Sequence, residues 1–318
     1  EAYDRFYKSC WNAAWQDAGY FACAQISILQ NRLEDALDEI DRSLIRNWHN
    51  HKARALKTAI LRRMDKTEEA LQLIEDSLAI DKFNFGCRYE KYLITNVADE
   101  LAVMKEMMRG EPHNYDEIAL DYCAAGCWQE AASLWNIAIA EGIVTPMTYY
   151  YLGWCLHQGG LPGVKQAFDD AVKACPDYCF PNRLEAILAL QCAMEQNPND
   201  ARAPYYLGNL YYDKRQYDLS MEAWETSARL DDSFPTVWRN LALAFFNKKN
   251  EEAKAIECME RAFRLDSTDA RILMELDQLY KRVRRSHKER LAFLQQYPDL
   301  IKQRDDLILE EITLLNQT

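Results

Sequence analysis

Glycine and proline are scarce in this sequence. Ten glycines and nine prolines occur among 318 residues, which excludes the Pro- and Gly-rich composition of disordered chains. Hydrophobic residues make up 49% and charged residues 28%, an ordinary balance for a globular protein. The chain can therefore bury a long continuous core, and no low-complexity segment divides it.

Long apolar runs and clusters of positive charge are also missing. No run of about 18 apolar residues occurs, so the sequence predicts no membrane span. The net charge is −12, whereas nucleic-acid backbones select for clustered Lys and Arg, so we expect no general nucleic-acid partner. No glycine loop for phosphates and no nucleophile elbow is present. The sequence therefore offers no catalytic residues and no cofactor site, and we expect this segment not to be an enzyme.

Ten cysteines lie scattered through helical patterns, mostly at apolar positions. A secreted disulfide framework is usually short and loop-rich, so we predict reduced, buried thiols and a cytoplasmic location. Cys123 and Cys127 are four residues apart, as are Cys175 and Cys179, and four thiolates could bind zinc. Structural zinc sites usually use tighter turns, so core thiols are the favoured interpretation and we predict no metal.

Pairs of equivalent residues recur 34 positions apart. The segments "LEDALDEIDRSL" and "TEEALQLIEDSL" place alanine, isoleucine and serine alike. The pairs include Ala36 and Ala70, Ile40 and Ile74, Ile118 and Leu152, Gly126 and Gly160, and Leu207 and Leu241. A period of 34 residues is that of the tetratricopeptide repeat (TPR), in which each repeat is two antiparallel helices, A and B.

Small and large residues alternate as this repeat requires. Helices that cross closely need a small residue, and "YYLGNLYY" and "YYYLGWCL" place Gly208 and Gly153 at the eighth position of helix A. Trp224 is expected on the inner face of the following helix B. The sequence therefore predicts an all-α fold, a TPR-type α-solenoid in which antiparallel helix pairs form a right-handed superhelix.

We expect a single array over residues 1–318. Full helix pairs are predicted to begin near residues 17, 51, 112, 146, 201, 235 and 270. Residues 85–111 are shorter than one repeat, and residues 180–200 hold one helix before Asp200, which can cap the next helix. A leading helix is expected over residues 4–15, and no strand pattern is convincing.

A trailing helix over residues 300–315 carries apolar residues on more than one side. Ile308, Ile312 and Leu315 follow helical spacing, and Leu307, Leu309 and Leu314 widen the stripe. We expect this helix to bury one stripe and to expose another, through which chains could associate. The sequence begins at Glu1 rather than Met and ends just after this helix, so we expect a fragment of a longer protein.

Several segments resemble one particular family. "EAYDRFYKSCWNAAW", "RYEKYL", "FPTVWRNLALAFFNK" and "DARILMELDQLYKR" look like the TPR half of a bacterial family of unknown function. Members of that family carry an N-terminal β-sandwich region resembling aldose epimerases, followed by these repeats. The stretch from Cys179 to Arg304 is the most specific. The resemblance implies a bacterial origin, an absent N-terminal partner domain and a carbohydrate-related context, and it carries over no catalytic residues.

Side chains on the A helices are candidates for a ligand or peptide groove, because A helices line the concave face of such a superhelix. Rings give rigid contact area, amides bond to backbone, and Arg bonds to carboxylates. The candidate residues are Tyr150, Trp154, Arg202, Tyr205, Tyr206, Asn209, Tyr212, Arg239, Asn240 and Arg271. The alternative is that these side chains pack against each other or against the absent domain.

Three of these residues suggest a more specific ligand. Asn209, Asn240 and Arg271 fall where chaperone-binding TPR domains hold a C-terminal carboxylate, and the resemblance to that clamp is partial. Tyr205 and Glu275 stand where that clamp needs cations. A less specific polar groove is therefore favoured over a copy of the clamp.

The remaining polar clusters favour structural interpretations. His49 and His51 lie in "RNWHNHK" without local carboxylate or thiol partners, so a polar loop is expected rather than a metal site. His113 and His157 are expected at helix ends. The basic run "KRVRRSHKER" from Lys281 could contact an acidic partner, although a solvated helix junction is the favoured interpretation.

Two function classes remain open. The first is a non-catalytic interaction module that binds a peptide or protein partner in its groove. The second is an accessory domain that packs on an epimerase-like N-terminal domain and shapes its site, which depends on the family resemblance alone. The sequence favours the first class because no catalytic set is visible.

Overall fold

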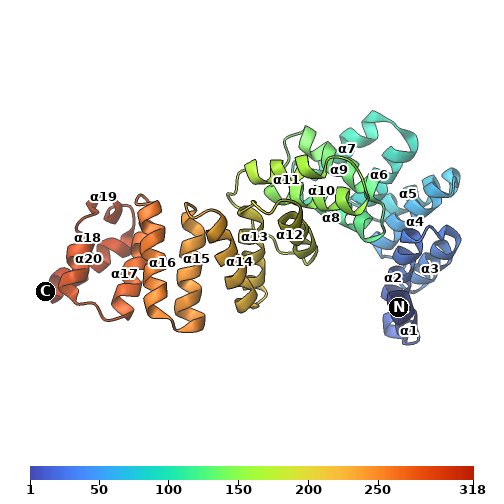
Figure 1. The fold of residues 1–318 in the computed structure, drawn as a ribbon. Coiled ribbons are helices and arrows are strands. Elements are labelled where there is room, and N and C mark those ends of the chain that lie inside the picture. The colour runs from blue at the N-terminus through green and yellow to red at the C-terminus, as the bar shows by residue number, and fades with distance from the viewer. The chain divides into compact units, whose positions relative to one another are not determined.

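The computed structural model describes every residue from Glu1 to Thr318, and the chain is helical with no strand (Figure 1). It divides into two compact units, Glu1–Pro176 and Asp177–Thr318. Each unit is built from helices that are antiparallel to their neighbours in sequence. The structure confirms the predicted all-α solenoid of TPR type, whereas a single array over the whole chain stays a prediction. No helix is both long and apolar enough to cross a membrane.

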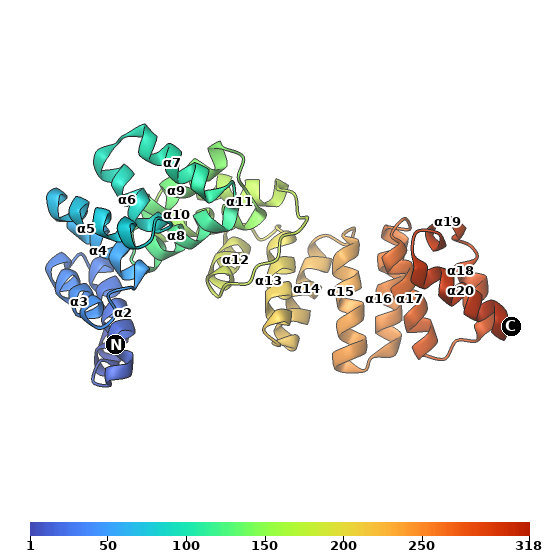
Figure 2. The same ribbon diagram turned by 180° about the vertical axis from the view of Figure 1, so that it is seen from behind.

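Unit 1 contains five helix pairs after a leading segment. The leading segment is α1 (Ala2–Ser9) and a 3₁₀ turn (Ala13–Trp15). The pairs are α2 (Gln16–Leu29) with α3 (Leu33–Arg46), α4 (His51–Arg63) with α5 (Thr67–Ile80), α6 (Phe85–Thr95) with α7 (Ala98–Met108), α8 (Pro112–Ala124) with α9 (Trp128–Ala140), and α10 (Pro146–Gln158) with α11 (Val164–Lys173). The first helix of each pair is the A helix and the second is the B helix (Figure 2).

Unit 2 begins with α12 (Glu185–Gln196), the one helix predicted for residues 180–200, which packs against the next helix in the chain. The helices that follow are α13 (Arg202–Asp213), α14 (Tyr217–Leu230), α15 (Pro235–Ala244) with a π-helical turn (Phe245–Lys249), α16 (Glu252–Leu265), α17 (Ala270–Arg282), α18 (His287–Leu294), α19 (Pro298–Ile301) and α20 (Asp305–Gln317). The seven predicted starts of A helices all lie within one residue of the observed starts, because the 34-residue period marks them.

Glycine at the eighth position allows the two helices of a pair to touch. A Cβ built at Gly208 would lie 2.4 Å from the ring of Trp224, and one at Gly153 would lie 2.5 Å from the ring of Phe168. Neither distance is tolerated between real atoms, so the large ring of helix B occupies the space that glycine leaves on helix A. This is the predicted exchange of small for large residues between paired helices.

Helix starts are set by side-chain caps that the sequence contains. The Asn50 side chain accepts a hydrogen bond from the backbone N–H of Ala53 at 3.0 Å. The Asp200 carboxylate accepts from the backbone N–H groups of Arg202 (2.7 Å) and Ala203 (3.1 Å). Such oxygens satisfy N–H groups that have no partner within the helix. The predicted cap at Asp200 is confirmed.

The ends of the chain differ from the prediction in detail. The leading helix expected over residues 4–15 is broken, because α1 ends at Ser9 and the 3₁₀ turn is capped by Asn12, whose side chain accepts from Ala14 at 3.0 Å. The trailing helix begins at Asp305 rather than near 300, since the short helix α19 precedes it. Of the apolar residues in α20, Leu307 and Leu314 are buried and Leu309, Ile312 and Leu315 are exposed.

Candidate functional site

A cavity of about 180 Å³ lies among the A helices of unit 1. It is bordered by α2, α4, α6 and α8. Phe21, Leu56, Phe83, Phe85 and Ile118 supply its apolar surface, and His51, Lys52, Asp81, Glu117 and Asp121 are among its polar residues. An apolar hollow with a few polar groups is the usual form of a ligand site. This cavity is therefore the candidate functional site of unit 1.

Local sequence determines how closely the helices around the cavity approach. A Cβ at Gly86 would lie 2.6 Å from the Cβ of Ala55, so glycine is what allows α6 to rest on α4. Asn84 starts α6 by accepting the backbone N–H of Cys87 at 3.1 Å, and its amide donates to the carbonyl of His51 at 3.3 Å. The first turn of α6 is thus tied to the first turn of α4 beside the cavity.

The charged groups at the cavity have an excess of carboxylates. The Lys52 ammonium lies 2.7 Å from a carboxylate oxygen of Glu117 and 2.8 Å from one of Asp121. The Asp81 carboxylate lies 3.8 Å from Nε2 of His51, a pairing that carries charge only when the imidazole is protonated. One permanent cation therefore faces three carboxylates, and the rim favours a positively charged ligand group.

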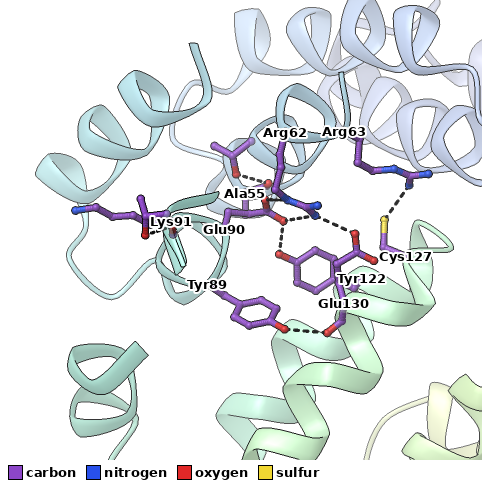
Figure 3. Close-up of polar contacts among 11 residues, drawn as sticks. Ala55, Arg62, Arg63, Tyr89, Glu90, Lys91, Tyr122, Cys127 and Glu130 are labelled. Carbon is purple, nitrogen blue, oxygen red and sulfur yellow. Dashed lines mark hydrogen bonds and ion pairs between the residues drawn. The ribbon is translucent and has the colours of Figure 1, made fainter. Parts of the chain in front are cut away.

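A buried polar network supports one wall of the cavity (Figure 3). Arg62 of α4 donates from Nε and Nη2 to the two carboxylate oxygens of Glu90 on α6, at 2.6 and 3.2 Å. Tyr122 of α8, which lines the cavity, donates its hydroxyl to Glu90 at 2.6 Å. Arg62 also donates to Glu130 of α9 at 2.9 Å. Side chains from α4, α6, α8 and α9 thus hold the short repeat of α6 and α7 in place.

Burial controls the protonation of this network. The Glu90 side chain is wholly buried, and desolvation raises the pKa of its carboxyl although the hydrogen bonds from Arg62 and Tyr122 oppose the rise. Burial and the nearby Glu90 raise the pKa of the Tyr122 hydroxyl well above its usual range. The phenol therefore stays protonated and remains a hydrogen-bond donor.

In unit 2 the two predicted groove asparagines contact each other. The Asn240 amide on α15 donates to Oδ1 of Asn209 on α13 at 3.1 Å. The same oxygen accepts the indole N–H of Trp224 at 3.0 Å. An asparagine in mid-helix costs roughly half a kcal/mol relative to alanine, and these bonds offset that cost without a ligand.

The predicted groove arginines share one carboxylate. Glu275 of α17 accepts two hydrogen bonds from Arg239, both at 2.5 Å, and one from Arg271 at 3.2 Å. Arg239 is largely buried, whereas the Arg271 side chain is 63% exposed. A clamp for a terminal carboxylate would need these cations free, so Glu275 occupies the position that such a ligand group would take.

Tyr205 and Arg202 flank the ring of Phe234. The ring centroids of Tyr205 and Phe234 are 4.8 Å apart, and the guanidinium carbon of Arg202 lies 4.1 Å from the Phe234 centroid. Tyr206 is buried, and half-buried Tyr212 lies 5.4 Å from Trp224 between ring centroids. These residues contribute to the helix contacts of unit 2, and a role in ligand binding stays a prediction.

The other two predicted groove residues, Tyr150 and Trp154, belong to unit 1. Both lie on α10 and are buried. The ring of Trp154 meets that of Trp128 at 6.0 Å and 86°, and the ring of Tyr150 lies 6.4 Å from Phe168. The ten predicted residues are thus divided between the two units, and neither Tyr150 nor Trp154 lines the cavity of unit 1.

The cavity residues were not among the sequence candidates. Positions 2, 5, 6, 9, 12 and 13 of helix A face the groove of a TPR superhelix. In the repeats near residues 17 and 51 these positions include Phe21, Gln25, Lys52 and Leu56. The predicted groove residues came instead from later repeats, whose A helices are richer in aromatic residues and asparagine. Phe83 lies in the turn before α6, and a rule based on helix positions cannot find it.

The cysteines, His51 and the basic run from Lys281 have the surroundings of structural residues. All ten cysteines are free thiols, of which Cys175 alone is exposed, and no three His, Cys, Asp or Glu side chains form a group that could hold a metal ion. The expectation that His51 lies in a loop is wrong, because His51 is the first residue of α4. The basic run is not wholly solvated, since Arg290 is 2% exposed and donates to Asp277 and Glu310.

Comparisons with known proteins agree with the repeat. A family model described as tetratricopeptide repeat matches residues 205–270, which span α13 to α16. MamA (residues 41 to the end) from Desulfovibrio magneticus RS-1 is 19% identical, with 61% of this chain and 97% of that chain covered and a TM-score of 0.35. TTC0263, a thermophilic TPR protein from Thermus thermophilus, is 16% identical, with 64% and 98% covered and a TM-score of 0.36.

A third similar structure is YrrB, described as a TPR protein with an unusual peptide-binding site. It is 15% identical, with 72% of this chain and 92% of that chain covered and a TM-score of 0.26. Similarity at this level does not transfer function from one protein to another. The resemblance to an epimerase-associated bacterial family stays a prediction.

Proposed function

We propose that this protein is a non-catalytic scaffold that binds a peptide segment of a partner protein through its A helices. The observation that carries the proposal is the cavity of unit 1, because its apolar surface is framed by helices and its charged rim is accessible. Lys52, Glu117 and Asp121 expose 48, 40 and 38% of their side chains. Charged groups this exposed can exchange a partner within the protein for one on a ligand.

The chemistry of the cavity selects the kind of peptide. Phe21, Phe85 and Ile118 form a surface suited to a bulky apolar side chain. Three carboxylates, Asp81, Glu117 and Asp121, line the cavity together with one lysine, and this acidic rim attracts a basic group of a ligand. The matching ligand is an extended peptide that presents a large apolar residue beside a Lys or Arg.

A displayed random peptide library tests this function. Selection on the native protein is expected to enrich peptides with an apolar residue next to a basic one. The double variant Glu117→Lys with Asp121→Lys should bind the enriched peptides at least about tenfold more weakly, which corresponds to about 1.4 kcal/mol. The matched control is Glu68→Lys with Glu69→Lys, which makes the same charge change on exposed positions of α5.

Two results would contradict the proposal. One is enrichment of acidic peptides, or of none, on correctly folded protein. The other is equal loss of binding in the cavity variant and in the α5 control, because only the general field of the protein would then be involved.

A second contact surface on unit 2 is part of the same proposal. Arg202, Asn209, Tyr212, Arg239, Asn240 and Arg271 keep partly or fully exposed side chains on α13, α15 and α17. Among the three arginines of this row, Arg271 is the most exposed. A peptide bound at unit 2 would contact this polar row through its backbone, because amide and guanidinium groups recognise carbonyl oxygens.

The location of the protein, its self-association and a partner domain are further hypotheses within this proposal. The free thiols favour a cytoplasmic location. The exposed Leu309, Ile312 and Leu315 of α20 favour self-association. Packing on an epimerase-like N-terminal domain would make that domain a further partner.

A further inference from the structure

A second hollow, of about 210 Å³, lies at the N-terminal end of unit 1. It is formed by α1, α2 and α3 and is separate from the cavity described above. Its residues are Tyr3, Tyr7, Tyr20, Asp35, Asp38, Glu39 and Arg42. A single water needs only about 10–15 Å³, so the hollow has room for a small ligand group. Three tyrosines and three carboxylates give it a strongly electron-rich lining.

The tyrosine rings form walls at right angles. Tyr3 and Tyr7, one turn apart on α1, are nearly parallel with ring centroids 6.1 Å apart. Tyr20 on α2 stands at 81° to Tyr7 with centroids 6.4 Å apart. Ring faces carry partial negative charge and attract cations. Guanidinium groups already lie near two of these rings, with Arg32 5.2 Å from Tyr3 and Arg42 5.6 Å from Tyr20.

The nearby cations are committed to other carboxylates. Arg32 pairs with Asp35 at 2.5 Å, and Arg42 pairs with Asp38 at 2.9 Å. The third carboxylate of the hollow, Glu39, has no such ion pair. Each arginine thus has an acidic partner of its own, and one negative charge remains in the hollow.

Glu39 is buried with one oxygen unsatisfied. Its side chain is 5% exposed, and its Oε1 accepts the hydroxyl of Tyr3 at 2.5 Å. Its Oε2 is buried without any hydrogen-bond partner. Buried carboxylates are normally paired with a cation or hydrogen-bonded at both oxygens, because water no longer stabilises the charge. The unsatisfied oxygen and the absent cation both indicate a missing positive group.

We propose that this hollow binds the ammonium group of an alkylamine or of a lysine side chain, held between the tyrosine rings and the Glu39 carboxylate. An ammonium is a compact charge with three N–H donors, so it can serve Oε2 of Glu39 and a ring face together. Tyr3, which is partly exposed, donates its hydroxyl to Oε1 of Glu39, so Oε2 is the oxygen left for the cation. This site is independent of the peptide cavity, from which it differs in all its lining residues.

Calorimetric titration of the intact chain tests the proposal with two probes. The first is n-butylammonium, with n-butanol as its neutral control. The second is a short peptide with one lysine, with the same peptide acetylated at that lysine as control. We expect the charged member of each pair to bind and the neutral member to bind at least tenfold more weakly. Tighter binding of the butylammonium would indicate a small-molecule amine, and tighter binding of the peptide would indicate a lysine of a partner protein.

Two variants connect the binding to the named groups. Glu39→Gln keeps the shape and the hydrogen bond from Tyr3 but removes the charge, and it should weaken both charged probes at least tenfold. Its melting temperature should equal or exceed that of the native chain, because the unpaired buried charge is gone. Tyr7→Leu removes an exposed ring without touching Glu39 and should weaken the same probes. Glu34→Gln, an exposed change on the same helix, should leave binding unchanged.

The proposal is overturned if neither charged probe binds the folded native chain at millimolar concentration. It is also overturned if n-butanol binds as well as n-butylammonium, or if Glu34→Gln weakens binding as much as Glu39→Gln. Should Glu39→Gln fail to fold, unchanged binding in Tyr7→Leu would exclude the aromatic site.

Discussion

Oδ1 of Asn209 accepts the indole N–H of Trp224 at 3.0 Å and the amide of Asn240 at 3.1 Å. Trp224 is 3% exposed, so its N–H depends on Asn209 for a hydrogen-bond acceptor. An asparagine chosen from the sequence as a ligand contact therefore also joins α13, α14 and α15.

Replacing this asparagine should destabilise the protein. We expect Asn209→Ala to lower the free energy of unfolding by about 1–3 kcal/mol, because it leaves a buried donor without a partner. Chemical denaturation measures the change. In a double-mutant cycle with Trp224→Phe, which removes the N–H, the two losses should be less than additive. Strict additivity would show that Asn209 and Trp224 are not coupled. An Asn209→Ala variant of native stability that no longer binds peptide would assign the residue to the ligand instead.

The buried Arg62–Glu90 pair should show a pH-dependent cost when it is broken. Arg62→Met leaves the Glu90 carboxylate buried without its cation, and we expect a loss of about 3–5 kcal/mol at neutral pH. Burial already raises the pKa of Glu90 in the folded chain, and loss of Arg62 raises it further. The folded variant then binds more protons than the unfolded chain, so its stability rises as the pH falls.

The measurement for this pair is denaturation of both proteins at about pH 5 and about pH 7. The difference between native chain and Arg62→Met should be smaller at the lower pH. As a matched control, Arg62→Met with Glu90→Gln should lose the added pH dependence, because the carboxyl of Glu90 is no longer there to titrate. A difference that grows on acidification would contradict the assignment.

The thiols should differ in reactivity according to burial. Cys175 is exposed and the other nine are buried, so an aromatic disulfide reagent should modify one thiol quickly in the native protein and ten after unfolding. Cys175→Ser should abolish the fast phase. Two or more fast thiols in a stable native protein would contradict the packing described for unit 1 and unit 2.

The buried thiols should make the protein less stable at alkaline pH. Burial raises the pKa of Cys127 and Cys258 from 9.0 to about 11. The unfolded chain releases these protons from about pH 9, whereas the folded chain holds them to about pH 11. The folded state therefore binds more protons in this window, and the free energy of unfolding falls as the pH rises through it. Cys127→Ala with Cys258→Ala should make that fall shallower.

The glycine at the eighth position of helix A should not accept a side chain. Gly153→Ala places a Cβ 2.5 Å from the ring of Phe168, and we expect a loss of about 1–3 kcal/mol from overpacking. Phe168→Leu removes ring atoms from that space, so the double variant should lose less than the sum of the single losses. Denaturation of all four proteins measures the coupling, and full additivity would show that the two helices adjust separately.

The helix pairs could be predicted because their cause is local and repeated. Gly153 and Gly208 mark the close crossings, and the 34-residue period marks where each A helix begins. The break of the leading segment at Ser9 was missed, since it depends on a capped turn at Asn12 that no repeat unit contains.

The sequence by itself determined the fold class, the helix starts and the positions of the small residues, because these depend on spacing along one chain segment. Only the tertiary structure decided which polar groups satisfy one another. Arg239 and Glu275 are 36 residues apart, and Arg62 and Glu130 are 68 apart. The unsatisfied oxygen of Glu39 likewise results from the partners that other helices supply. Whether a polar residue serves the fold or a ligand depends on which donors and acceptors are brought within hydrogen-bonding distance, and that is a property of packing between repeats.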